Sequence, residues 1–95
     1  MIFVTVGSGP LDFTRLVKKM DEIGRDLGEE IIIQRGFTQY ETRFARSFTF
    51  VPYKEALEFF RRAKVIVGHA SAGPIMQARE FNKPLIVFPR DGQLK

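Results

Sequence analysis

Residues 64–89 read KVIVGHASAGPIMQAREFNKPLIVFP, and this stretch decides the fold. A short apolar run at residues 65–67 is followed by small residues at 68–73, and Pro74 then opens a segment with helical spacing. A second apolar run at residues 84–89 is bounded by prolines. Proline is favoured in the first turn of a helix, where its missing N–H has no intrahelical partner. The stretch therefore predicts a strand, a loop, a helix and a second strand, which is the unit of a parallel sheet.

The loop at residues 68–73 has the composition of an anion site. Ser71, Ala72 and Gly73 carry little or no side chain, so a ligand can approach the backbone closely. Free N–H groups in the first turn of a helix lie at the positive end of the helix dipole and bind phosphate without a lysine. His69 is interpreted either as a general base or as a residue that orients the loop, because no Asp or Glu lies near it in the sequence. Gly68 and Gly73 can also be plain turn glycines.

The rest of the chain repeats the same alternation. Further apolar runs predict strands at residues 2–6, 31–34 and 47–51. Two amphipathic segments predict helices, one that Asp12 can cap and Gly28 can stop, and one at residues 53–63. The apolar residues at helical spacing are Phe13, Leu16, Val17, Met20, Ile23 and Leu27 in the first helix, and Ala56, Leu57, Phe60 and Ala63 in the second.

Five strands and about three helices predict one α/β domain over residues 1–95, with a Rossmann-like parallel sheet and helices on both faces. In such sheets ligands bind beyond the carboxyl ends of the strands, where the strand order reverses. The small residues Gly7, Ser8 and Gly9 follow the first strand, and the loop at 68–73 follows the fourth. We therefore expect both loops to face one ligand.

Composition limits the possible ligands and compartments. No apolar run approaches the ~18 residues of a membrane span, and no basic region precedes Ile2 as in a signal peptide. The sequence has no cysteine and one histidine, so a transition-metal site is not expected. A net charge of +4 favours anionic partners such as nucleotides, nucleic acid or anionic lipid.

Residues 35–46 are less regular and place Phe37, Tyr40 and Phe44 among three arginines. Aromatic and basic residues in alternation can bind a single-stranded nucleic acid. The same pattern describes a connection whose rings pack on the core, and no RNA-binding motif is present. Nucleic acid is therefore not the partner that the sequence favours.

Three segments together resemble the C-terminal domain of family 28 glycosyltransferases. They are residues 4–7 (VTVG), 68–73 (GHASAG) and 83–87 (KPLIV). The resemblance covers the whole chain and is greatest to single-domain members: the catalytic subunit of the dolichol-linked N-acetylglucosaminyltransferase and small bacterial exopolysaccharide glycosyltransferase subunits. It implies one half of a GT-B enzyme that binds a nucleoside diphosphate sugar, usually a UDP-sugar, as substrate and needs no cofactor.

The resemblance also implies the roles of particular residues. The diphosphate is expected at Ala70, Ser71, Ala72 and Gly73, and the sugar or phosphate beside Gly7, Ser8 and Gly9. A family acid that binds the ribose hydroxyls falls at Gln77, whose amide can still donate and accept hydrogen bonds. Glu80, one turn later, is the other candidate. Pro74 stands where the family usually has a polar residue, and it removes one N–H donor.

In the enzymes that the chain resembles, a separate membrane-associated subunit brings the lipid-linked sugar acceptor. We therefore expect a cytoplasmic chain that such a partner recruits to the membrane. The chain is expected to be active only with this partner, and the partner is expected to supply the catalytic base. Relatives continue past Arg90 with a further segment and a helix, so the resemblance implies a domain shortened at its C-terminus. The alternative is a nucleotide-binding module without catalytic activity.

Overall fold

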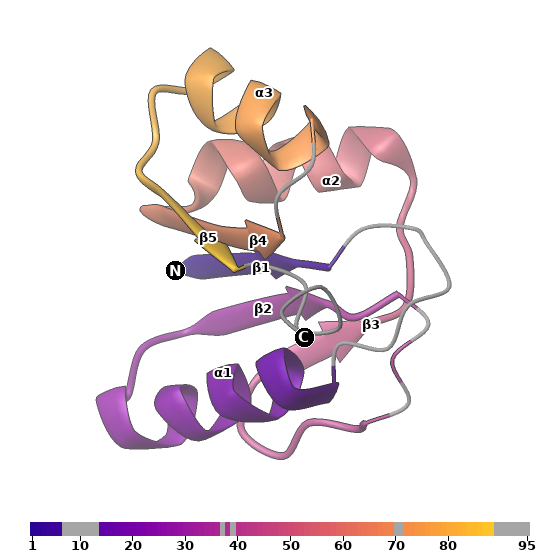
Figure 1. Cartoon of the computed structure of the whole chain (residues 1–95), viewed down its shortest axis with the longest axis vertical. Helices are drawn as coiled ribbons and strands as arrows, with labels where there is room; N and C mark the ends of the chain where they lie inside the picture. The colour runs from indigo at the N-terminus through magenta and orange to yellow at the C-terminus, as the bar shows by residue number, and fades with distance from the viewer. Residues whose placement is uncertain (7–13, 37, 39, 70–71, 89–95) are drawn as a thin grey trace, which may run out of the picture.

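The computed structural model describes residues 1–6, 14–36, 38, 40–69 and 72–88 (Figure 1). Its elements follow one another in the order expected of a parallel α/β domain. In chain order they are β1 (Ile2–Thr5), α1 (Thr14–Leu27), β2 (Ile31–Gln34), β3 (Arg46–Phe48), α2 (Tyr53–Arg62), β4 (Val65–His69), α3 (Ala72–Glu80) and β5 (Leu85–Phe88).

All five strands pair in parallel, in the order β3-β2-β1-β4-β5. The central strand β1 pairs with β2 on one side and with β4 on the other, so that Val4 lies between Ile33 and Val67. The chain builds outward from β1 first through β2 and β3, and then in the other direction through β4 and β5. The strand order therefore reverses between β1 and β4, which is where a ligand is expected in this architecture.

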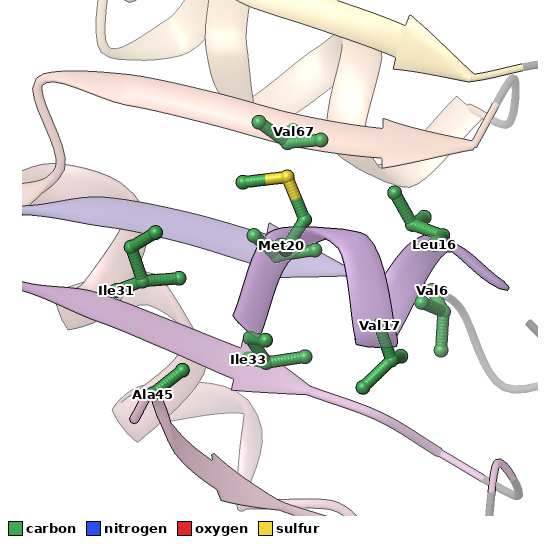
Figure 2. Packing of buried hydrophobic residues seen from close by; sticks show 9 residues of the cluster. Val6, Leu16, Val17, Met20, Ile31, Ile33, Ala45 and Val67 are labelled. Carbon is green, nitrogen blue, oxygen red and sulfur yellow. The ribbon is translucent and has the colours of Figure 1, made fainter. Parts of the chain in front are cut away.

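The three central strands β2, β1 and β4 are buried on both faces, as their apolar runs predict, whereas Ile86 and Val87 of the edge strand β5 are exposed (Figure 1). Helix α1 covers one face, where Val17 and Met20 are buried against side chains such as Ile33 and Val67 (Figure 2). Helices α2 and α3 cover the other face with Phe60 and Ala78. Successive residues of a strand point to opposite faces, so β1 sends Phe3 to one core and Val4 to the other.

Several predicted boundaries are confirmed and two details are wrong. Gly28 ends α1 with a φ of +65°, and its N–H bonds to the Gly24 carbonyl at 3.2 Å, as expected of a helix stop. Leu27 is 64% exposed rather than buried, because the last turn of α1 extends past the amino ends of the strands (Figure 1). The third strand covers residues 46–48 instead of 47–51, because Gly36, with a φ of +57°, turns the neighbouring chain away after β2.

The crossover from β2 to β3 has no helix among its described residues, and Asp21 of α1 holds it instead. The Asp21 side chain is buried, and its carboxylate accepts hydrogen bonds from the N–H groups of Arg43 (2.9 Å), Phe44 (2.8 Å) and Ala45 (2.7 Å). The Tyr40 hydroxyl donates a fourth, at 3.4 Å. Burial alone raises the pKa of Asp21, but these four hydrogen bonds outweigh burial, so its pKa lies below the ordinary value.

A second carboxylate ties the amino terminus to the sheet. Glu29 lies 2.8 Å from Lys64 Nζ and 2.9 Å from the α-amino group of Met1. Hydrogen bonds from these two cations lower the pKa of Glu29 to about 2. Lys64 precedes β4 and Met1 precedes β1, so the pairing links two neighbouring strands at their amino ends.

These two carboxylates predict how stability depends on pH. A group whose folded pKa is depressed contributes stability above its unfolded pKa and loses it as the pH falls toward the folded pKa. We expect the melting temperature to be constant above about pH 5 and to fall steadily toward pH 2. Glu29→Gln should make this fall shallower. Melting curves between pH 7 and pH 2.5 test the prediction, and an unchanged or rising melting temperature below pH 5 contradicts it.

Candidate ligand site at the carboxyl edge of the sheet

The two strands at the point of reversal stay paired up to their carboxyl ends. Thr5 of β1 lies beside Gly68 of β4, and the Val6 N–H bonds to the Gln34 carbonyl of β2 at 3.2 Å. The chain therefore leaves β1 and β4 from adjacent positions at one edge of the sheet. Of the predicted site residues, Gly7, Ser8, Gly9, Ala70 and Ser71 lie outside the described residues.

The loop after β4 is shorter than the sequence predicts. Strand β4 continues through Gly68 and His69, and both residues pair with β5, so neither belongs to the loop. Helix α3 begins at Ala72 rather than at Pro74, which places Ala72 and Gly73 in its first turn. The first N–H groups of a helix have no intrahelical acceptor. The positive end of α3 therefore lies directly at the carboxyl edge, next to the end of β4.

Gly68 is a residue of close approach and not a plain turn glycine. A Cβ atom at this position would lie 3.2 Å from the Cβ and Cγ atoms of Pro74 and 3.3 Å from the Thr5 carbonyl oxygen. Both Gly68 and Pro74 are buried. Pro74 therefore costs the first turn one N–H donor, but its ring packs against the bare backbone of Gly68 and fixes where α3 starts.

The two ribose-binding candidates lie in one pocket between α2 and α3. The pocket has a volume of about 330 Å³ and is lined by Tyr53, Leu57, Met76, Gln77, Glu80 and Phe81. The Gln77 amide nitrogen donates to the Tyr53 hydroxyl at 3.2 Å, which fixes the orientation of the amide. The Gln77 side chain is half-buried and Glu80 is exposed. The structure thus brings Gln77 and Glu80 together in one pocket, and their positions do not decide which of them binds the ribose.

Sequence reasoning missed Tyr53 and Met76 as site residues. Tyr53 is the first residue of α2, and α2 follows β3, so its first turn lies at the carboxyl edge where the site is. Tyr53 is 68% exposed and Met76 is 64% exposed, and both line the pocket. A general signal for Tyr53 existed, because the first residue of a helix that follows a parallel strand lies at the carboxyl edge, on the side of the sheet where ligands bind.

The aromatic and basic segment does not present its described rings as one row. Tyr40 turns inward to Asp21, whereas Phe44 is 56% exposed with the Arg25 guanidinium 5.8 Å above its ring. Phe37 lies outside the described residues. Within the described ranges, no group of three or more His, Cys, Asp or Glu side chains is placed to hold a metal ion. No helix in the part of the chain that the structure describes is long and apolar enough to cross a membrane.

Comparison with known protein families places the whole chain in one family. Residues 1–95 match the family described as the glycosyltransferase family 28 C-terminal domain. The chain therefore belongs to this family, whose members are glycosyltransferase domains that bind nucleotide sugars. The match agrees with the Rossmann-like α/β fold that the sequence predicts and the five parallel strands show. A comparison with curated proteins found no match.

Proposed function

We propose that the chain is the donor-binding subunit of a GT-B glycosyltransferase that transfers a sugar from a UDP-sugar to a lipid-linked acceptor. The observation that carries this proposal is the close packing of Pro74 on Gly68 at the point of strand reversal. This contact sets the first turn of α3 at the carboxyl edge, where an anionic ligand can reach its N–H groups. Family membership supplies the reaction class.

In the proposed reaction, the diphosphate lies against the backbone N–H groups of the first turn of α3. An acceptor hydroxyl attacks the anomeric carbon of the sugar, the bond from this carbon to the diphosphate oxygen breaks, and UDP leaves with the bonding electron pair. Preorganised N–H groups and the positive end of the α3 dipole stabilise the negative charge that develops on the diphosphate. The acceptor proton goes to a base on the partner subunit, and His69 is the weaker candidate in this chain.

The nucleoside is proposed to lie in the pocket between α2 and α3, with its ribose hydroxyls on Gln77. We expect Gln77→Ala to weaken UDP binding by roughly fivefold to tenfold, the effect of losing one or two hydrogen bonds. Tyr53→Phe keeps the ring but removes the hydroxyl that orients the amide, so it should show part of the same loss. Calorimetric titration with UDP measures both, and Glu80→Gln tests the other candidate. Wild-type affinity in both Gln77→Ala and Tyr53→Phe would remove this pocket from the site.

We further propose that the chain works with a membrane-associated subunit that binds the acceptor. One domain of a GT-B enzyme encloses only the donor side, so a second protein surface is needed. Phe44 is exposed, stacks under Arg25 and is followed closely by the exposed Arg46. An exposed aromatic residue among arginines is typical of the centre of a protein interface.

Phe44→Asp should weaken co-purification of the chain with its membrane-anchored partner, because it places a charge where an apolar contact is expected. Ile86→Asp is the matched control, since Ile86 is similarly exposed but lies in β5, at the edge of the sheet opposite β3. Circular dichroism should show that both variants fold. Full transferase activity of the isolated chain on a lipid-linked acceptor would refute the need for a partner.

A further inference from the structure

Arg35 lies at the carboxyl edge of the sheet and is not used by the site described above. It directly follows β2, the strand beside β1. One guanidinium nitrogen, Nη1, donates to the Thr38 carbonyl at 3.0 Å. The Nε atom is buried and has no hydrogen-bond partner. Buried donors in folded proteins are nearly always paired, so a cation with an unpaired buried N–H requires an explanation.

The ion pairs of the molecule do not supply this explanation. Among the described residues, Arg25 pairs with Asp26 and Arg61 pairs with Glu58, but no carboxylate pairs with Arg35. Its positive charge at the edge of the sheet is therefore uncompensated by any of these residues.

A purely structural role accounts for only part of the arrangement. Arg35 could serve to close the turn at residues 35–38 by its bond to Thr38. A backbone hydrogen bond already closes this turn, from the Thr38 N–H to the Arg35 carbonyl at 2.9 Å, and the Arg35 N–H bonds to the Phe48 carbonyl of β3 at 2.9 Å. The structural role uses one of five N–H donors and needs no permanent charge.

We propose that Arg35 is the cation of a phosphate-binding subsite at the carboxyl ends of β1 and β2. The inference rests on the proposed function, whose donor and acceptor are both expected to carry phosphate. A guanidinium presents a planar fork of N–H groups that matches two phosphate oxygens, and the unpaired Nε–H belongs to that fork. Because Nε is covered in the ligand-free chain, binding turns the half-buried side chain so that a phosphate oxygen accepts from it. The phosphate belongs to the donor diphosphate or to the lipid-linked acceptor.

Two titrations distinguish these sources. The chain is titrated with UDP and, separately, with a short-chain, water-soluble isoprenyl diphosphate. Arg35→Gln is expected to weaken binding of one of them by roughly tenfold to a hundredfold, as for loss of a hydrogen bond to a charged group. Arg35→Lys should recover only part of the affinity, because it restores the charge without the fork. Arg43→Gln is the control, since Arg43 is an exposed arginine of the same connection between β2 and β3. A loss confined to UDP assigns the subsite to the donor, and a loss confined to the isoprenyl diphosphate assigns it to the acceptor.

A second measurement uses the wild-type chain and therefore tests the inference even if the Arg35 variants fail to fold. In the wild-type chain, the NMR signal of the Arg35 Nε–H should shift when the ligand saturates the site. Ligand affinities that do not change in a folded Arg35→Gln variant, or an Nε–H signal unmoved by both saturating ligands, would overturn the inference while leaving UDP binding intact. A wild-type chain that binds neither compound would overturn this inference and the proposed function together.

Discussion

Asp21→Ala is expected to lower the free energy of unfolding by about 3–5 kcal/mol, the largest effect of any single substitution considered for this chain. The Asp21 carboxylate is buried and accepts from three consecutive backbone N–H groups, those of Arg43, Phe44 and Ala45. Alanine would leave these donors without their acceptor, at a place that is buried at Ala45 and partly buried at Arg43 and Phe44. The segment that they fix carries the chain from β2 to β3, so this edge of the sheet should loosen with it.

Urea denaturation followed by circular dichroism measures this effect. Asp21→Asn should fall between the wild type and Asp21→Ala, because an amide keeps one oxygen acceptor but turns a donor toward the remaining N–H. Asp26→Ala is the matched control: Asp26 is an exposed acid on the same helix that pairs with Arg25, and surface pairs contribute little. An Asp21→Ala variant within 1 kcal/mol of the wild type, as an order-of-magnitude limit, would show that the carboxylate does not hold the crossover.

Gly68→Val should destabilise the fold by about 2–3 kcal/mol and also abolish most UDP binding. A side chain at this position meets Pro74 on one side and the Thr5 carbonyl on the other, both at distances that a Cβ atom rarely tolerates. The backbone is the rigid side of this contact, so α3 must move outward. That movement displaces the first turn of α3 from the carboxyl edge.

A double-mutant cycle isolates the contact. Gly68→Ala introduces only the Cβ atom, and Pro74→Ala removes the Cγ atom that lies 3.2 Å from it. If the two side chains compete for the same space, the double variant should lose less stability and less UDP affinity than the sum of the single variants. Strict additivity would show that the Pro74 ring does not set the position of α3.

The strands could be predicted from the sequence because parallel strands buried on both faces leave continuous apolar runs. The helix stop at Gly28 could also be predicted from a local feature, because the positive φ at a helix end favours glycine. Asp21 could not: it looks like a surface residue of an amphipathic helix, and its partners lie 22 to 24 residues further along the chain and act through their backbone.

The location of the candidate site could be predicted from the sequence, but the contacts between its residues could not. The two small-residue segments indicate the point of strand reversal, and Gln77 and Glu80 lie together in the pocket between α2 and α3. Gly68 was assigned to the loop because glycine and a change of composition suggest a turn. Its actual place in β4 depends on a contact with Pro74 across the fold, and local composition does not encode such contacts. The place of Tyr53 as the first residue of a helix indicates the carboxyl edge, but its bond to Gln77 joins two helices and cannot be predicted locally.

The most direct test of the proposed function is a titration of the chain with UDP, followed by NMR of the backbone amides. We expect saturable binding, with the largest shifts at Ala72 and Gly73 in the first turn of α3 and further shifts at Gln77. A UDP-sugar should then be consumed only when a membrane-associated partner and a lipid-linked acceptor are added. Tight binding of a short single-stranded oligonucleotide with no response to UDP would contradict the proposal.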